Sequence, residues 1–316
     1  MTEEEMYVEY RGLYLPATMY SPESLKNAEE FNVRDDDIFI GTYPKSAASR
    51  ILPLGLLRMR TLQAWVRCTR SEIGTTWMQE IVPLIMSGGD FKPVLTIPSW
   101  NRVPWLELNR TIELKLEDRP SPRILATHFQ YPMMPKSWFS SKTKLVYVMR
   151  NPKDVFTSSY HYCRMASYLV DPGTCDEFLM KFLNGKVIFG SWFDHVKGWL
   201  NAKEKDRILY LTYEEMIMDL KGSISKMCGF LGKPLSEEVI ESIADHCTFK
   251  NMKQNKMSNY SLVPKQFMDT SKSEFLRKGI SGDWKNLFTV AQAELFDSVY
   301  KEKLKDVDFN FIWDKN

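Results

Sequence analysis

Two short stretches of the chain carry residue types that hold a phosphate group. The first, residues 38–46, is an apolar run that ends in a loop with Lys45 and Ser46. The second starts at Gly74 and continues with apolar residues at helical spacing until Gly88. Backbone N–H groups of a glycine-containing loop, the positive end of a helix dipole and a lysine all attract one anion. Joined together, the two stretches would form a strand, a phosphate-binding loop and a helix.

Residues 47–73 separate these stretches and differ from them in composition. The 27 residues hold five arginines, a single acid and an apolar run, residues 51–57. A basic amphipathic helix for a membrane surface or a partner is one interpretation. Pro53 and Gly55 would disrupt a helix in the apolar part, and the arginines fit no single face. We therefore favour the other interpretation, an in-frame insertion such as a translated unspliced intron.

Two further polar groups follow predicted strands. Residues 123–128 indicate a strand that ends at His128, and residues 144–149 a strand that precedes Arg150. Ligands lie beyond the carboxyl ends of strands in an open parallel sheet. His128 could be a general base there, because its unperturbed pKa of ~6.5 leaves it mostly neutral; a structural histidine is the alternative. Arg150, with Ser158 two turns along the next helix, could hold a second phosphate, or it could be a surface arginine.

The elements that would position these residues alternate along the chain. Predicted strands at 38–46, 123–128, 144–149 and 207–213 alternate with helical patterns, among them 74–88 and the segment after Pro152. The strands are almost continuously apolar, which is typical of a parallel sheet covered on both faces. We predict an α/β fold with a central parallel sheet flanked by helices, in one domain spanning residues 1–316. Further expected helices are 21–31, 176–186, 187–204 and one that ends near Gly229, and residues 99–107 are an expected aromatic loop.

Composition narrows the class of protein. The net charge is +2, and the inserted stretch supplies five of the positive charges, so general nucleic-acid binding is not expected. Five scattered cysteines fit neither a disulfide framework nor a zinc site. The N-terminus is acidic, and no apolar run reaches the ~20 residues that span a bilayer. We expect a cytoplasmic protein without a membrane segment.

The motifs, taken in order, resemble those of the cytosolic sulfotransferases. These enzymes transfer a sulfuryl group from 3′-phosphoadenosine 5′-phosphosulfate (PAPS), with 3′-phosphoadenosine 5′-phosphate (PAP) as product, to small acceptors. The resemblance extends over nearly all of residues 6–313 except 47–73. It rests on residues 42–46 with 74–77, on residues 150–154 with Ser158, and on residues 277–279 with 282–285. The tail, residues 311–314, looks most similar to the amine-sulfotransferase branch.

The resemblance implies a PAPS site and roles for its residues. The residues that match the 5′-phosphosulfate loop are Lys45, Ser46, Gly74, Thr75 and Thr76. Those that match the 3′-phosphate site are Arg150, Ser158, Arg277, Lys278 and Gly279. Those that match the adenine site are Trp77 and Phe249, with Tyr213, Thr248 and Met252 nearby. His128 matches the catalytic base, and Lys45 would also stabilise charge on the leaving phosphate oxygen. No metal is expected.

The resemblance also implies partners. Matches to a family dimer motif predict a homodimer through Lys285, Thr289, Val290 and Glu294. The acceptor would be an aromatic or alicyclic alcohol, phenol or amine, because the candidate pocket residues are apolar. These candidates are Trp105, Phe129, Tyr131, Met133, Met134 and Tyr162.

The insertion decides how active this form can be. Looping out 27 residues costs roughly 3 kcal/mol plus a constant. A broken loop would lose about three charge-assisted contacts of ~1.5–3 kcal/mol each and weaken PAPS binding at least ~1,000-fold. We expect the second outcome, hence an impaired sulfotransferase; the alternative is a non-catalytic relative that folds and dimerises but binds no PAPS. A P-loop kinase or NTPase is disfavoured, because Lys-Ser precedes Gly-Thr-Thr and no Gly-x-x-x-x-Gly-Lys motif is present.

Overall fold

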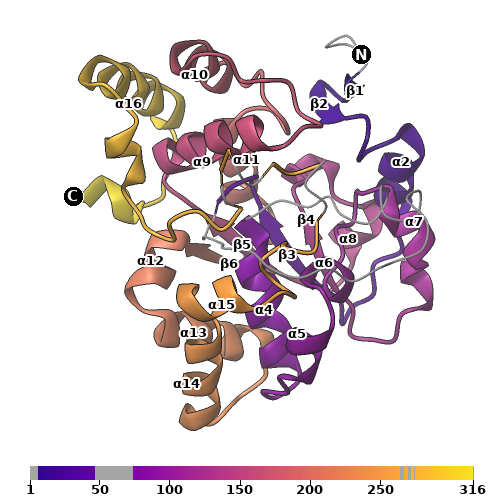
Figure 1. Cartoon of the computed structure of the whole chain (residues 1–316). Coiled ribbons are helices and arrows are strands. Elements are labelled where there is room, and N and C mark those ends of the chain that lie inside the picture. Colours follow the sequence, from indigo (N-terminus) through magenta and orange to yellow (C-terminus); the bar gives the residue numbers. More distant parts are fainter. Residues whose placement is uncertain (1–5, 47–73, 264–266, 270–271, 274, 316) are drawn as a thin grey trace.

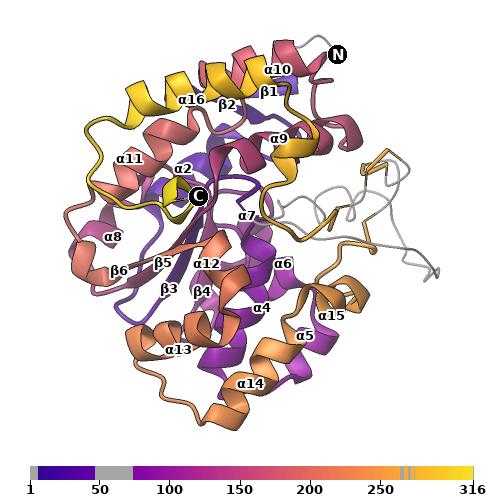
Figure 2. The ribbon, with the colours of Figure 1, turned by 90° about the vertical axis from the view of Figure 1, so that its left-hand side faces the viewer.

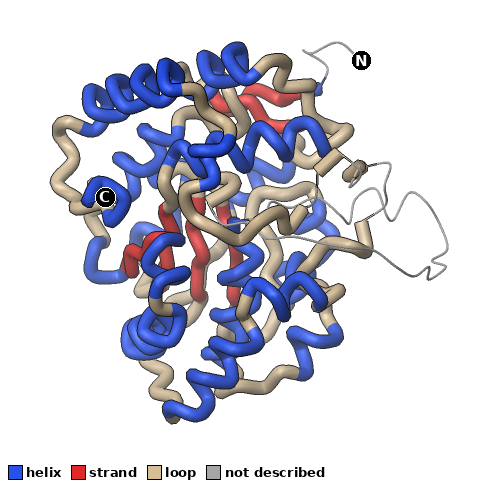
Figure 3. Tube along the Cα trace, turned by 60° about the vertical axis from the view of Figure 1, so that its left-hand side comes forward, coloured by secondary structure: helices blue, strands red, loops and turns tan. Residues whose placement is uncertain are grey.

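A parallel four-stranded sheet forms the centre of the molecule. The computed structural model describes residues 6–46, 74–263, 267–269, 272–273 and 275–315. The strands β3 (Ile38–Thr42), β4 (Ile124–Thr127), β5 (Lys144–Met149) and β6 (Ile208–Thr212) lie in the order β4-β3-β5-β6 and are all parallel. Figure 3 shows them as a core enclosed by helices. The predicted α/β fold with a central parallel sheet is confirmed.

Burial explains why these strands are apolar on both faces. All five residues of β3 and the last five of β5 are buried. Helices cover both sides of the sheet, with α9 and α11 on one side and α4 and α13 on the other (Figure 2). Gly41 allows β3 to lie close to its neighbour, because a Cβ there would be 3.2 Å from the Tyr147 ring. Apart from the tyrosines Tyr147 and Tyr210, these strands carry polar side chains only at their ends.

The remaining elements wrap around this sheet (Figure 1). A separate antiparallel hairpin is formed by β1 (Tyr7–Tyr10) and β2 (Leu13–Pro16). The helices are α2 (Pro22–Glu30), α4 (Gly74–Met86), α5 (Lys92–Thr96), α6 (Ser99–Arg102), α7 (Arg110–Leu114), α8 (Lys136–Ser140), α9 (Pro152–Met165), α10 (Cys175–Leu183), α11 (Trp192–Leu200), α12 (Tyr213–Met218), α13 (Leu220–Leu231), α14 (Glu237–His246), α15 (Phe249–Gln254) and α16 (Val290–Leu304).

Local capping signals placed two helices, α2 and α9, correctly. Ser21 caps α2 by accepting a hydrogen bond from the Ser24 N–H, and Asn151 caps α9 by accepting one from the Lys153 N–H. The structure also shows Thr289 as the cap of α16, a helix that was not predicted from the sequence. These side chains satisfy N–H groups that the first turn of a helix leaves without a partner.

Three sequence expectations were wrong in detail. Residues 184–191 connect α10 and α11 instead of continuing a helix, because the backbone takes positive φ at Gly185, Phe189 and Gly190. The expected loop 99–107 begins with α6, and its Trp105 pairs with Ala126 of β4. The helix expected after β6 is two helices, α12 and α13, which meet at Asp219.

Candidate active site

The carboxyl ends of the four strands bring the candidate residues to one edge of the sheet. Thr42 ends β3, His128 follows β4, Arg150 follows β5 and Tyr213 follows β6. The strands are parallel and neighbouring, so these four positions lie along the same edge. This is the place where an open α/β sheet binds its ligands.

The two halves of the predicted phosphate loop meet at this edge. The hydroxyl of Thr42 at the end of β3 lies 2.8 Å from the hydroxyl of Thr75 in the first turn of α4. This hydrogen bond joins residues 33 positions apart in the sequence. The stretch between Ser46 and Gly74 lies outside the described residues, so the expected disruption of the loop is not tested.

In the split loop, residues 42–46 with 74–77, the side chains of residues 42–46, 75 and 76 are buried and that of Trp77 is partly buried. Lys45 has a φ of +70°, and its ammonium lies 3.1 Å from the centroid of the Tyr162 ring, which stabilises a buried cation. The Ser46 hydroxyl donates to the Tyr43 carbonyl at 2.8 Å. The Thr76 hydroxyl is buried and makes no hydrogen bond to another described residue. A polar ligand atom would offset the free-energy cost of that burial.

His128 is held in a defined orientation. Its Nδ1 lies 2.6 Å from the carbonyl oxygen of Thr42. Because a carbonyl can only accept, Nδ1 carries the proton and Nε2 of the neutral ring carries the lone pair. The imidazole packs against Trp105, with centroids 4.1 Å apart, and against Phe189, at 5.2 Å. The geometry provides the tautomer that a general base at Nε2 requires.

Two buried groups hold the backbone of His128 from either side. The His128 N–H donates to Glu107 at 2.8 Å, and burial raises the pKa of the Glu107 carboxyl. The His128 carbonyl accepts from Nε2 of His195 at 3.1 Å. The Tyr147 hydroxyl lies 2.7 Å from Nδ1 of His195, and burial lowers the pKa of His195 to about 3. Sequence patterns did not reveal these contacts, because Glu107, Tyr147 and His195 come from three separate segments.

Arg150 links the split loop to the C-terminal part of the chain. Its guanidinium donates to the carbonyls of Lys45 and Ile280, both at 3.2 Å, and lies 4.4 Å from the centroid of the Tyr213 ring. Arg150 is 2% exposed, which excludes the alternative of a surface arginine. Ser158 is buried on α9.

The C-terminal loop, residues 277–284, contains its own counter-charge. Arg277 and Lys278 both form ion pairs with Asp283, and the Lys278 nitrogen lies 2.5 Å from the carboxylate. Burial opposes ionisation of Asp283, but its hydrogen bonds to Lys278, Asn286 and Arg277 lower its pKa to about 2. The predicted phosphate-binding cations are therefore already neutralised in part by Asp283.

A buried carboxylate on α9 fixes the turn of this loop. Asp154 accepts from the Gly282 N–H at 2.7 Å through one oxygen and from the Trp284 N–H at 3.0 Å through the other. The ammonium of the neighbouring Lys153 lies 3.9 Å from the centroid of the Trp284 ring. These contacts join the motif at residues 150–154 to the motif at residues 277–285 in one structural unit.

The predicted adenine residues surround the junction of α4, α12 and α15. The Trp77 indole donates to the Cys247 carbonyl at 2.8 Å, and its ring lies 5.6 Å from that of Tyr213. Phe249 packs directly on Gly279, whose φ is +67°; a Cβ at Gly279 would overlap the Phe249 ring. Thr248 is the N-cap residue of α15, and Met252 is a buried residue of the same helix.

Two cavities lie close to this edge. The first, of about 640 Å³, includes Lys45 and Tyr162, and the second, of about 450 Å³, includes Met19, Trp100 and Trp105. The six predicted acceptor residues do not share one of them: Tyr162 lines the first and Trp105 the second. The others are placed differently: Phe129, Met133 and Met134 are buried, and the Tyr131 hydroxyl donates to Glu204.

The predicted dimer residues lie at the start of α16 and just before it. Lys285 lies in a 3₁₀ helix, Asp283–Asn286, and Thr289 is the N-cap of α16. Val290 is 76% exposed. Within the described ranges, no helix is both long enough and apolar enough to cross a membrane.

Comparisons with known proteins identify the family of this chain. A family model described as a sulfotransferase domain matches residues 68–308. Sulfotransferase 2B1 of Mus musculus is 49% identical, over 98% of this chain and 83% of that protein, and the Homo sapiens protein is 46% identical, over 98% and 77%. The 3-beta-hydroxysteroid sulfotransferase of Cavia porcellus is 42% identical, over 93% of each chain. These relatives do not confirm a likeness to the amine-sulfotransferase branch.

Solved structures show the same fold. Mouse sulfotransferase SULT7A1 complexed with PAP has a TM-score of 0.72 and 30% identity, over 96% of each chain. Retinol dehydratase in complex with androsterone and PAP has a TM-score of 0.75 and 24% identity, over 97% of this chain and 91% of that one. This chain belongs to the sulfotransferase domain family and is a PAPS-dependent sulfotransferase.

Proposed function

We propose that this protein transfers the sulfuryl group of PAPS to the hydroxyl or amine of a small apolar acceptor, with His128 as the general base. The observation that carries the proposal is the 2.6 Å contact between Nδ1 of His128 and the Thr42 carbonyl. It leaves the lone pair on Nε2, which takes the acceptor proton. The resulting imidazolium keeps its Nδ1–H bond to Thr42, so the same contact stabilises the charged form.

The split loop would hold the 5′-phosphosulfate. Lys45, Ser46, Gly74, Thr75 and Thr76 are the assigned residues, and the buried Thr76 hydroxyl without a described partner supports the fit. PAPS, when bound, supplies the activated sulfuryl group. The Lys45 ammonium would then stabilise negative charge on the leaving phosphate oxygen.

The 3′-phosphate and the adenine would lie on opposite sides of Arg150. The residues assigned to the 3′-phosphate are Arg150, Ser158, Arg277, Lys278 and Gly279. The residues assigned to the adenine are Trp77, Tyr213, Thr248, Phe249 and Met252. Support comes from the contacts of Arg150, which links Lys45, Ile280 and the Tyr213 ring.

The second cavity is the proposed acceptor site. Its volume of about 450 Å³ suits a small ligand, and Trp105 both lines it and packs against the His128 ring. The 42% identity to a 3-beta-hydroxysteroid sulfotransferase favours an alicyclic alcohol over an amine.

Residues 47–73 are proposed to impair this activity, with loss of PAPS binding as the alternative outcome. They separate Ser46 from Gly74 within a loop whose N–H groups must point at one anion. The hydrogen bond between Thr42 and Thr75 supports the idea that a shortened chain would close the loop correctly. We also propose a cytoplasmic homodimer in which Lys285, Thr289, Val290 and Glu294 form the contact.

The first test compares the full chain with a variant that lacks residues 47–73. Calorimetric titration with PAP should show binding to the shortened chain that is tighter by at least ~1,000-fold. The shortened chain should then transfer radiolabelled sulfate from PAPS to a 3β-hydroxysteroid. Equal PAP affinities of the two chains would contradict the proposed impairment.

The second test addresses the base. His128→Asn in the shortened chain should reduce kcat by roughly 100-fold or more and leave PAP affinity within about twofold, because His128 is assigned to the proton and not to the nucleotide. A variant that keeps its kcat would remove His128 from the proposed mechanism.

A further inference from the structure

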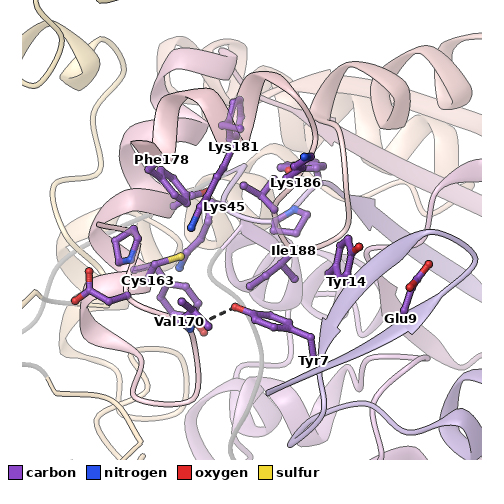
Figure 4. Close-up of a pocket in the computed structure, with 18 residues that line it drawn as sticks. Tyr7, Glu9, Tyr14, Lys45, Cys163, Val170, Phe178, Lys181, Lys186 and Ile188 are labelled. Atoms are coloured by element: carbon purple, nitrogen blue, oxygen red, sulfur yellow. Dashed lines mark hydrogen bonds between the residues drawn. The ribbon is translucent and has the colours of Figure 1, made fainter. Parts of the chain in front are cut away.

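The first cavity shares no lining residue with the second cavity, the proposed acceptor site, although Tyr162 of the six predicted acceptor residues lines it. It lies between the β1–β2 hairpin, the loop after β3 and the helices α9 and α10 (Figure 4). Neither His128 nor Trp105 is among its lining residues, and Lys45 is the one lining residue that belongs to the proposed PAPS site. Its volume of about 640 Å³ is in the range of drug-sized binding sites.

Aromatic rings form much of the wall. Tyr7 and Tyr14 come from the hairpin, Tyr43 follows β3 and Tyr162 comes from α9. Tyr14 is 48% exposed, so a large ring faces the cavity without being covered by the core. The Val170 N–H donates to the Tyr7 hydroxyl at 3.3 Å and holds the hairpin against the segment after α9 (Figure 4). Such walls suit a flat or alicyclic ring system.

Positive charge exceeds negative charge around the cavity. Lys45, Lys181 and Lys186 line it, against Glu9 and Asp171. Figure 4 shows Lys45 and Lys181 together, whereas Glu9 is at the far end on the hairpin. One oxygen of Asp171 accepts a hydrogen bond from the Gly173 N–H at 2.9 Å. This carboxylate is therefore already hydrogen-bonded within its own turn. The end near α10 therefore has the character of an anion site.

We propose that this cavity binds an organic anion: an aromatic or alicyclic ring system that carries a sulfate or carboxylate group. The ring lies against Tyr7, Tyr14 and Tyr43, and the anionic group lies at Lys181 and Lys186. Binding itself does not depend on sulfuryl transfer. The further statement that the occupant is of the product class, a sulfate monoester of an apolar ring, rests on the proposed function.

The test uses 1-naphthyl sulfate as the anionic probe and 1-naphthol as its neutral counterpart. Calorimetry on the full chain, without PAPS, measures both affinities. The double variant Lys181→Gln/Lys186→Gln should weaken 1-naphthyl sulfate about 10-fold and change 1-naphthol less than about twofold, because only the sulfate needs the two ammonium groups. Lys226→Gln/Lys233→Gln is the matched control, since it removes the same charge from exposed positions on and after α13. It should leave both affinities unchanged.

A second variant locates the probe. Val187→Trp fills the cavity from a half-buried lining position, and it should weaken 1-naphthyl sulfate at least ~10-fold with an unchanged circular dichroism spectrum. Unchanged binding in the double variant or in Val187→Trp, an equal loss in the control, or no binding to the unaltered chain would each overturn the proposal. His128→Asn should bind 1-naphthyl sulfate normally, so a failure of the catalytic proposal is distinguishable from a failure of this one.

Discussion

The split loop and the C-terminal loop both present cations to the same edge of the sheet, but they stabilise those cations differently. In the split loop the Lys45 ammonium lies on the face of Tyr162, and hydroxyl groups of Thr42 and Thr75 connect the two halves. In the C-terminal loop one carboxylate, Asp283, forms ion pairs with both Arg277 and Lys278. An aromatic face attracts a cation without presenting an anion, whereas a carboxylate competes with an incoming anion for the cations that it pairs with. We infer that a phosphate at the C-terminal loop must compete with Asp283 for Arg277 and Lys278.

The strongest perturbation of the C-terminal loop alone is Gly279→Ala. The added Cβ would overlap the Phe249 ring, and the φ of +67° strains a non-glycine residue. We expect PAP affinity to fall at least ~30-fold, measured by calorimetry on the chain without residues 47–73. Gly229→Ala is the control, because a Cβ there meets nothing within 4 Å. Equal effects of the two substitutions would show that the contact with Phe249 does not matter for the nucleotide.

Asp154→Asn distinguishes the contribution of the C-terminal loop to nucleotide binding from that of the split loop. The amide can accept only one of the two N–H groups, and its NH₂ would oppose the other donor, a cost of ~2 kcal/mol. PAP affinity should fall about 30-fold, and affinity for adenosine 5′-phosphate, which has no 3′-phosphate, should change less than about threefold. The exposed Asp194→Asn on α11 is the control. Parallel losses for both nucleotides would mean that Asp154 supports the whole fold and not the 3′-phosphate loop.

Thr75→Val tests the split loop and, unlike Asp154→Asn, should weaken the binding of both nucleotides. It removes the hydroxyl that bonds to Thr42 and costs ~1 kcal/mol, so PAP and adenosine 5′-phosphate should both bind about fivefold more weakly. Thr96→Val removes a helix hydroxyl far from the site and should change neither affinity. If PAP alone bound more weakly, Thr75 would contribute to the 3′-phosphate site and not to the 5′-phosphate loop.

The smallest expected effect is a dependence of stability on pH that comes from Asp283. Its pKa is lowered to about 2, so its contribution is complete above the unfolded pKa of ~3.9 and disappears as the pH falls towards 2. Asp283→Asn should remove this part of the acid destabilisation, measured as the melting temperature between pH 5 and pH 2.5. The difference in melting temperature between Asp283→Asn and the unaltered chain should therefore become smaller as the pH falls. A difference that stays constant would show that the ion pairs do not form in solution.

The sequence predicted the strands and the motifs much better than it predicted their connections. Continuous apolar runs located β3, β4, β5 and β6, because strands buried on both faces leave that pattern. Caps such as Asn151 located helix starts, since the cap and its N–H partner are two residues apart. The apolar residues of segment 184–191 keep a helical spacing, which predicts a helix, but the positive φ of Phe189 makes the segment a connection.

The sequence by itself therefore determined the family and the parallel α/β sheet, and the proposed roles of Lys45, His128 and Arg150 rest on its motifs. Only the tertiary structure decided how these side chains are held. Glu107 binds the His128 backbone 21 residues away, and Asp154 binds the turn at Gly282 from 128 residues away. Asp283 lies only five or six residues from its cations, yet charge pairing in a loop leaves no periodic pattern. Local spacing encodes helices, strands and motifs, whereas a contact between distant segments depends on a path of the chain that no single stretch records.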